Sequence, residues 1–286
     1  MEESISDKSK LDQYYTSPEV AKYFTKKVTS LLGDNALFIE PSAGIGAFVE
    51  ALEGKCIKSF DLSPVLPETV EKDFLTTTQE DFDGGVHFIG NPPFGKNSSL
   101  AVKFFNHCAK YGESISFILP KTFKKIFFKE RLNPYMHLVF EEDCPNHSFV
   151  LDGSPYDVPC VFQVWVKRDY PRDVPAISDN CLWQIVSKDG ADLFIRRVGG
   201  CAGKVLDKNA DSLSPSTTYY LKMLEKGVDS KIKDIYPILK EVASNTAGVR
   251  SISLKEIQYI LENSYEMVDT ESESYYPTEM EAKTSY

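Results

Sequence analysis

The chain has 286 residues, of which 42% are hydrophobic and 26% charged, and its formal net charge is −10. This ordinary globular composition excludes a wholly disordered or collagen-like chain, and no apolar run reaches the roughly 18–20 residues that a membrane span needs. The N-terminus lacks the apolar segment of a secretory signal. Six cysteines without a CxxC pair argue against a disulfide framework or a zinc ribbon, so we expect a cytoplasmic, intracellular protein without a metal.

The negative charge is unevenly distributed along the chain. Residues 262–286 hold seven acidic residues and one lysine, so this segment carries −6 and the remainder of the chain −4. The stretch 121–131 holds four lysines and one arginine against one glutamate. A local basic face can therefore coexist with an acidic tail, and a nucleic-acid partner is not excluded.

Strands and helices are predicted to alternate over the first 130 residues. Ser17-Pro18 has the residue types of an N-cap and first helical position. The expected strands are 36–39, 57–62, 86–90 and 115–119, and the expected helices are 18–31, 47–52, 99–109 and 121–132. This alternation predicts an α/β fold with a doubly wound, mostly parallel sheet.

The pattern changes after residue 132. Strands are expected at 138–140, 148–151 and 158–166 with no helix between them, which predicts an antiparallel edge to the same sheet. A break follows at 169–180, which contains Pro171 and Pro175. Further strands at 182–186 and 193–198, and a helix opened by a Ser253/Glu256 capping box, predict a smaller C-terminal module.

A glycine-rich turn follows the strand at 36–39. Its sequence, Glu40-Pro41-Ser42-Ala43-Gly44-Ile45-Gly46, leads into a helix, so backbone N–H groups can approach an oxygen-rich or anionic ligand. Asp61 comes 21 residues after Glu40, at the end of the next strand, where an acid commonly binds ribose hydroxyls. The turn lacks the GKS/GKT ending of a phosphate-binding ATPase loop. The alternative is a tight turn needed only for packing.

The second motif is Asn91-Pro92-Pro93-Phe94, directly after the strand at 86–90. The prolines fix the backbone and withhold two N–H donors, which leaves the Asn91 side-chain oxygen and the Pro92 carbonyl as acceptors beside a flat ring. Such a site suits a planar amino group on a π-system, such as the exocyclic nitrogen of adenine. Accepting hydrogen bonds from both of its N–H groups favours a pyramidal, more nucleophilic nitrogen, and no histidine base is needed. The alternative is a plain loop with a buried phenylalanine.

Taken together, residues 38–46 and 91–94 resemble the class I S-adenosylmethionine-dependent amino-methyltransferases, and within them the adenine-N6 DNA methyltransferases. The segment Gln13-Tyr14-Tyr15-Thr16-Ser17-Pro18-Glu19-Val20 resembles the N-terminal motif of the subgroup in which this motif comes first and the target-recognition region last. The resemblance covers residues 13 to about 168. It implies a seven-stranded sheet with an antiparallel edge, S-adenosyl-L-methionine as cofactor and S-adenosyl-L-homocysteine as product.

The resemblance also implies the site residues. The target base would be held by Asn91, Pro92, Pro93 and Phe94. The implied cofactor-binding positions are Tyr15, Thr16, Glu40, Pro41, Ala43, Gly44, Gly46, Asp61, Asp73 and Phe74. Thr16 and Tyr15 would meet the methionine carboxylate, Asp61 the ribose, and Asp73 with Phe74 the cofactor adenine. Asp73 could instead be only a helix or turn cap.

Adenine inside a duplex cannot reach such a pocket, so the base must be flipped out while phosphate contacts hold the strand. The nucleic-acid contacts that we expect are Lys121, Lys124, Lys125, Arg196 and Arg197. A solvated helix face is the alternative for the lysines. The second aromatic ring that usually sandwiches the flipped base is left open among Phe123, Phe149 and Phe162.

The sequence therefore predicts a flexible N-terminus (1–12), a catalytic domain (13–170), a target-recognition module (180–265) and an acidic, disordered tail (266–286). The expected activity is methylation of adenine N6 in DNA, with a cognate restriction enzyme as a potential partner. One alternative is a different methyl acceptor with a similar planar nitrogen, either adenine in RNA or the side-chain amide of glutamine. The methyltransferases that act on glutamine usually carry Tyr at the position of Phe94. The other is a catalytically silent subunit, against which the intact motifs argue.

Overall fold

The computed structural model describes residues 14–267 except Asp34, Asp83, Asp152, Asn180, Cys181, Asp211 and Ser212. The predicted flexible segment 1–12 lies outside these residues, as do residues 268–286 of the predicted tail 266–286, whereas residues 266 and 267 end a helix. The chain divides into two compact units. One comprises Met1–Pro175 with Asn245–Val249, and the other Ala176–Ser244 with Arg250–Tyr286.

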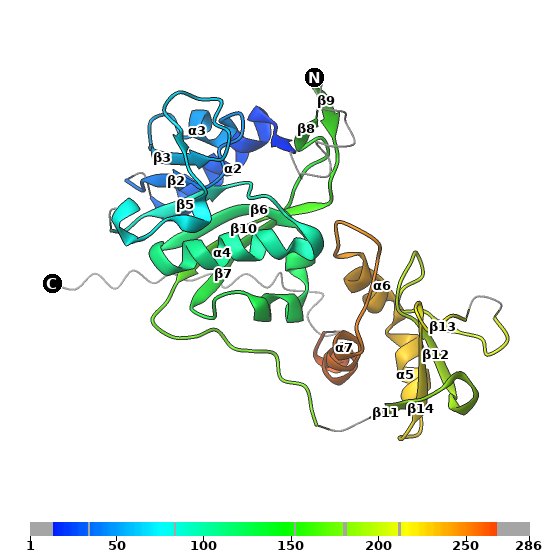
Figure 1. Cartoon of the computed structure of the whole chain (residues 1–286). Coiled ribbons are helices and arrows are strands. Elements are labelled where there is room, and N and C mark those ends of the chain that lie inside the picture. The colour runs from blue at the N-terminus through cyan, green and yellow to red at the C-terminus, as the bar shows by residue number, and fades with distance from the viewer. Residues whose placement is uncertain are drawn as a thin grey trace. The chain divides into compact units, whose positions relative to one another are not determined.

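The first unit is built on a seven-stranded sheet with the order β4-β3-β2-β5-β6-β10-β7 (Figure 1). The strands are β2 (Phe38–Glu40), β3 (Cys56–Asp61), β4 (Val70–Glu71), β5 (His87–Gly90), β6 (Ser114–Pro120), β7 (Met136–Asp143) and β10 (Cys160–Lys167). All pairs from β4 to β6 are parallel, and β10 is antiparallel to both of its neighbours. The doubly wound sheet with an antiparallel edge is confirmed.

Three α-helices flank this sheet in the chain, namely α2 (Pro18–Leu32), α3 (Ala47–Ala51) and α4 (Ser99–Tyr111), and Figure 1 shows α4 lying over the sheet. Helix α2 begins where the sequence predicts, because the Ser17 hydroxyl accepts a hydrogen bond from the Val20 N–H at 3.3 Å. Its apolar side is buried, and the Phe24 ring stacks on Phe162 of β10 at 4.1 Å. All seven residues of β6 are buried, as expected of a central strand covered on both faces.

The order of the sheet reverses at β2. Chain connections run outward from β2 through β3 to β4 on one side, whereas β5 lies on its other side. In open α/β sheets such a switch point leaves a crevice at the carboxyl ends of the strands. Glu40 ends β2, Asp61 ends β3 and Asn91 directly follows β5. Both sequence motifs therefore converge on this crevice.

One predicted strand belongs to a different sheet. The segment 148–151 was expected at the edge of the main sheet, but β8 (Phe149–Leu151) pairs with β1 (Tyr15–Thr16) and β9 (Ser154–Tyr156). Gly153, with φ 76°, turns β8 back into β9 as a tight hairpin. This prediction is wrong because the hairpin finds its partner in the N-terminal strand, about 130 residues earlier, rather than in its neighbours along the chain.

The segment 121–132 is not the continuous helix that its pattern predicts. It forms two 3₁₀ helices, η4 (Lys121–Lys124) and η5 (Ile126–Arg131), separated by Lys125 with ψ 128°. The rings of Phe123 and Phe128 pack 4.8 Å apart. Residues five positions apart do not share a face of an α-helix, so this packing favours the broken conformation.

The second unit has a four-stranded antiparallel sheet in the order β11-β14-β12-β13, followed by three helices. Its elements are β11 (Trp183–Ile185), β12 (Leu193–Arg196), β13 (Val205–Leu206), β14 (Thr218–Met223), α5 (Val228–Asp234), α6 (Tyr236–Ser244) and α7 (Leu254–Met267). Leu193 and Ile195 pack with apolar residues of the helices, whereas Phe194 packs with Tyr220 in a separate cluster. Successive residues of β12 thus face opposite sides of the sheet, and the helices cover one of these sides.

The predicted capping box is present at the start of α7. The Ser253 N–H donates to the Glu256 carboxylate at 2.8 Å, and the Glu256 N–H donates to the Ser253 hydroxyl at 3.2 Å. The helix continues through Met267, beyond the predicted end at Leu261. Within this unit the strands β13 and β14 and the helices α5 and α6 were not predicted.

Candidate functional site

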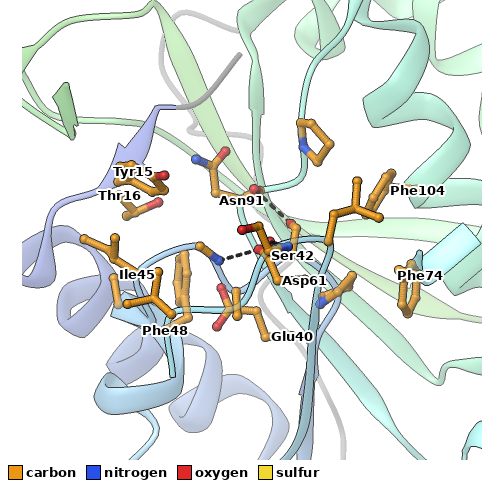
Figure 2. A pocket seen from close by; sticks show the side chains of 18 of the residues that line it. Tyr15, Thr16, Glu40, Ser42, Ile45, Phe48, Asp61, Phe74, Asn91 and Phe104 are labelled. Carbon is orange, nitrogen blue, oxygen red and sulfur yellow. Dashed lines mark hydrogen bonds between the residues drawn. The ribbon is translucent and has the colours of Figure 1, made fainter. Parts of the chain in front are cut away.

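A cavity of about 580 Å³ lies at the carboxyl ends of β2, β3 and β5 (Figure 2). This volume is typical of small-molecule sites. Predicted site residues that line it are Tyr15, Thr16, Glu40, Pro41, Ala43, Gly44, Asp61, Asp73, Phe74, Asn91 and Pro93. Figure 2 shows Thr16 near one end and Phe74 at the other, with Asp61 between them. An elongated ligand with distinct ends fits this distribution.

The glycine turn is fixed by the strand beside it. The Gly44 N–H donates to Asp61 Oδ2 at 2.8 Å, and the Ser63 N–H donates to Asp61 Oδ1 at 2.9 Å. Gly44 has φ 54°, and a Cβ there would lie 3.0 Å from the Tyr15 ring, so the backbone needs a residue without a side chain. The Asp61 carboxylate keeps further lone pairs that can accept from a ligand hydroxyl.

Gly46 has a different reason to be glycine. It has φ 90°, and a Cβ there would lie 2.3 Å from Cδ1 of Leu66. Gly46 does not line the cavity, because its free side faces Leu66. At Gly46 the absence of a side chain is therefore required for packing against Leu66. Gly46 is not placed to contact a ligand in the cavity.

Glu40 is a buried acid at the end of β2, with 2% of its surface exposed. Burial raises its pKa well above the ordinary value, and the nearby Asp61 raises it further, while a hydrogen bond from the Val49 backbone opposes the shift. Within the part of the chain that the structure describes, Glu40 Oε2 has no hydrogen-bond partner. A buried acceptor of this kind fits a cationic or donor group of a ligand.

Asn91 presents its side-chain oxygen as a free acceptor. Its Nδ2 donates to the Tyr14 carbonyl at 3.0 Å, so the amide orientation is set by the N-terminal strand segment. Its Oδ1 is buried and has no hydrogen-bond partner among the described residues. The Asn91 carbonyl accepts from the Ser42 hydroxyl at 3.2 Å, which ties this corner to the glycine turn (Figure 2). Asn91 Oδ1 is thus a second unsatisfied acceptor at the cavity, besides Glu40 Oε2, and it is held in a rigid frame.

Tyr14 and Tyr156 were not singled out by the sequence. Their rings stack 5.2 Å apart with an interplanar angle of 7°, and Tyr14 lines the cavity. Tyr156 lies on β9 and is 38% exposed. Only the pairing of β1 with the β8–β9 hairpin brings these tyrosines together, and no local signal in the sequence announces that pairing.

The aromatic residues expected around the target base are placed differently from the prediction. Phe94 is 7% exposed and belongs to the hydrophobic core, and Pro92 is also buried. The Phe94 carbonyl accepts from the N–H groups of Leu100 and Ala101, which anchors the segment onto the start of α4. Phe94 therefore does not present a stacking surface in this structure. The open candidates Phe123, Phe149 and Phe162 are each 0% exposed and are core residues.

Asp73 and Phe74 lie at the far end of the cavity. Asp73 Oδ1 accepts from the Leu75 N–H at 2.9 Å and caps a short 3₁₀ helix, η1 (Phe74–Thr76). The Phe74 ring is nearly buried and stacks on Phe104 at 5.6 Å. Asp73 is thus both a cap and a lining residue, so the two alternatives for it are compatible.

The basic residues expected to contact nucleic acid differ in their partners. Lys121 and Lys124 form ion pairs with Asp143 at 2.7 and 2.9 Å, and Lys125 is buried. In the second unit, Arg196 ends β12 and donates to the Thr217 hydroxyl at 2.8 Å, and Arg197 follows it. Their roles remain predictions.

Over the described ranges, no group of three or more His, Cys, Asp or Glu side chains is arranged to hold a metal ion. None of the described helices combines the length and apolarity that crossing a membrane requires.

The strand order with its antiparallel β10, and the crevice at the switch point, are those that the resemblance to the class I methyltransferases implies. No protein-family model matches the chain. Protein ENHANCED DOWNY MILDEW 2 of Arabidopsis thaliana is 23% identical over 193 residues, which are 58% of this chain and 15% of that protein. The chain thus matches only a small part of this relative.

Two solved structures are similar to about half of this chain. The 23S rRNA methyltransferase ErmE is 16% identical, with 55% of this chain and 71% of that chain covered and a TM-score of 0.41. The N-methyltransferase NodS from Bradyrhizobium japonicum WM9, in complex with S-adenosyl-L-homocysteine, is 11% identical, with 52% and 86% covered and a TM-score of 0.38. The strand order by itself identifies the doubly wound α/β sheet with an antiparallel edge.

Proposed function

We propose that this chain transfers a methyl group from S-adenosyl-L-methionine to the exocyclic N6 of adenine in DNA, with the base flipped to the Asn91 corner. The single observation that carries the proposal is Asn91 Oδ1, a buried acceptor with no partner among the described residues, held by the Tyr14 carbonyl at the rim of the crevice. An unsatisfied buried acceptor costs about 1–3 kcal/mol, so its retention at a cavity indicates a ligand that donates to it.

The residues of the crevice fit the cofactor. The unpartnered Glu40 Oε2 suits the amino group of the methionine moiety, and the remaining lone pairs of Asp61 suit ribose hydroxyls. The turn at Gly44 lets the backbone approach closely, and Phe74 offers an apolar wall at the other end. When bound there, S-adenosyl-L-methionine supplies the electrophilic methyl group of its sulfonium.

Asn91 acts on the amine that is to be methylated. Its Oδ1 accepts one N–H of the amino group, which draws the nitrogen lone pair out of conjugation with the ring and increases its nucleophilicity. The Tyr14 carbonyl holds the amide in this orientation, because a reversed amide would place two oxygens against each other. Orientation by a fixed acceptor is a recognised source of rate enhancement.

We assign contact with the extruded base to Tyr156, which is not among the residues that line the cavity but stacks on Tyr14, which is. It is 38% exposed and stacked on Tyr14, whose carbonyl holds Asn91, whereas Phe123, Phe149 and Phe162 are core residues. Base–aromatic stacking is worth about 1–3 kcal/mol and tolerates any base. Contact with Phe94 would require that ring to leave the core, so Tyr156 takes its place in this proposal.

The test is incubation of the protein with methyl-labelled cofactor and either unmethylated DNA or RNA of the same sequences, followed by nucleoside analysis. We expect N6-methyldeoxyadenosine from the DNA. If the label appears only in N6-methyladenosine from the RNA, then RNA and not DNA is the substrate of the same reaction. No labelled nucleoside from either substrate, with cofactor binding intact, would refute the proposal and favour a silent subunit.

A further inference from the structure

Helix α4 forms part of the cavity wall at the end where Phe74 lies. Leu100 and Phe104, four positions apart on this helix, both line the cavity, and Phe104 stacks on Phe74 at 5.6 Å (Figure 2). His107 and Tyr111 continue the same face of the helix, because the spacings of three and four residues repeat its turn. Neither lines the cavity, so each can act on it only through other residues.

His107 holds the turn that carries Phe74. Its Nε2 lies 2.8 Å from the Thr77 hydroxyl, and this hydroxyl donates its hydrogen to the Phe74 carbonyl at 2.7 Å. A hydroxyl has one hydrogen, so it accepts in the bond with His107, and Nε2 carries the proton. The His107 ring also packs edge-on against the Phe74 ring at 5.2 Å, with an interplanar angle of 77°. One histidine thus fixes both the backbone and the ring of Phe74.

The protonation state of His107 agrees with this role as a donor. His107 and Thr77 are both buried. Burial lowers the pKa of His107 below its ordinary value, and Lys110 lowers it further, whereas the Thr77 backbone and Asp73 act in the opposite direction. The ring is therefore neutral at neutral pH, with a single N–H to donate. The Tyr111 hydroxyl donates to the Thr77 carbonyl at 3.4 Å, so α4 holds Thr77 by its side chain and by its backbone.

The segment that His107 holds has little support of its own. Phe74 belongs to η1, a 3₁₀ helix of three residues, and such turns have weaker hydrogen-bond geometry than an α-helix. Its beginning is capped by Asp73, and its end is the residue Thr77. The position of the Phe74 wall therefore depends on contacts from outside the turn, and α4 supplies them through His107.

We propose that His107 is a positioning residue for the cofactor, which keeps the Phe74 wall in place for the adenine of S-adenosyl-L-methionine. His107 does not touch the ligand and acts through Thr77 and Phe74. The inference rests on the proposed function in placing the cofactor adenine against Phe74. It does not depend on which nucleic acid, or which amine, receives the methyl group.

The test measures the affinity of the full chain for S-adenosyl-L-homocysteine and for methylthioadenosine, which has the adenine and ribose but lacks the amino-acid part. The variant His107→Phe keeps a ring and removes the donor, whereas His107→Gln keeps a donor. Thr77→Val removes the hydroxyl and Thr77→Ser retains one. The double variant His107→Phe/Thr77→Val completes a double-mutant cycle.

His87→Phe is the matched control. The His87 ring is half-buried and its Nδ1 lies 2.9 Å from the Ser114 hydroxyl, so it resembles His107 in its surroundings. His87 begins β5 and Ser114 begins β6, so this pair lies at the amino ends of the strands, away from the cavity. A urea midpoint is measured for every variant, so that a loss of affinity can be separated from a loss of folding.

We expect His107→Phe and Thr77→Val each to bind both ligands roughly tenfold more weakly, and the double variant to bind no more weakly than either. His107→Gln and Thr77→Ser should recover most of the affinity, and His87→Phe should match the wild type. Because Thr77→Val and Thr77→Ser leave His107 in place, this pair decides the matter even if His107→Phe does not fold.

Wild-type affinity in His107→Phe or in Thr77→Val overturns the proposal. A loss confined to S-adenosyl-L-homocysteine also overturns it, because the adenine end would then be undisturbed, and so do additive losses in the double variant. A wild type that binds both ligands with this dependence on His107 but methylates no nucleic acid leaves the inference standing while the proposed function fails.

Discussion

Glu40 gives a prediction in which stability and ligand binding change in opposite directions. It is fully buried at the end of β2, and its pKa is raised well above the ordinary value by burial, with a further contribution from Asp61. Because the folded protein then binds a proton more tightly than the unfolded chain, stability falls as the pH rises from the unfolded pKa, near 4.5, towards the raised pKa of the folded state. The variant Glu40→Gln has no such charge to bury.

The size of the effect follows from linkage. Each unit by which folding raises the pKa removes about 1.4 kcal/mol of stability on the alkaline side. We therefore expect Glu40→Gln to unfold in urea at the same midpoint as the wild type near pH 4, and at a higher urea midpoint than the wild type at pH 8. The exposed Glu50→Gln is the matched control, and we expect it to follow the wild type at both pH values.

The same substitution should weaken cofactor binding. In the proposed function Glu40 faces the methionine amino group, and loss of its charge there would cost about 2–5 kcal/mol, which calorimetry would detect as a loss of thirtyfold or more in affinity. A Glu40→Gln variant that is no more stable than the wild type at pH 8 would refute the destabilising effect of the buried charge. Unchanged affinity for S-adenosyl-L-methionine would refute the assignment of Glu40 to the ligand.

Three further predictions concern packing and local structure. Gly46→Ala places a Cβ against Leu66 at a residue with φ 90°, so we expect the protein to lose about 1–3 kcal/mol of stability in urea unfolding. The double variant Gly46→Ala/Leu66→Ala should recover part of this loss. An unchanged urea midpoint in Gly46→Ala would contradict the prediction. Tyr156→Ala should raise the KM for nucleic acid by roughly tenfold, whereas Tyr156→Phe keeps the ring and should match the wild type, so equal KM values in all three proteins would exclude stacking. Ser253→Ala removes the cap of α7 and should cost about 1 kcal/mol, measured by the urea midpoint, and no shift would show that the cap is dispensable.

Features with a local chemical signature could be predicted from the sequence. Ser17 and Pro18 specify the start of α2. The glycine turn after β2 (40–46) and the proline corner after β5 (91–94) are each formed by consecutive residues of the chain. The parallel sheet follows from the alternation of elements, and a parallel sheet brings the carboxyl ends of its strands to one edge. The convergence of Glu40, Asp61 and Asn91 on one cavity is therefore accessible to sequence reasoning.

Features that depend on distant pairing could not be predicted. The contact of Tyr14 with Tyr156 requires β1 to pair with a hairpin far along the chain, and turn chemistry does not specify that partner. The ion pairs of Lys121 and Lys124 with Asp143 likewise depend on the register of β7 against β10. Burial of Phe94 follows from how Gly95, with φ 67°, turns the chain into α4, and the motif alone does not contain that geometry.

The central claim is that Asn91 Oδ1 acts on the amine and not on the cofactor. The most direct measurement compares single-turnover methyl transfer and cofactor affinity in the wild type and in Asn91→Ala. We expect the rate of methyl transfer to fall by about 100-fold or more, with the affinity for S-adenosyl-L-methionine nearly unchanged. A variant that transfers methyl groups at the wild-type rate, or that loses the cofactor together with the activity, would contradict it.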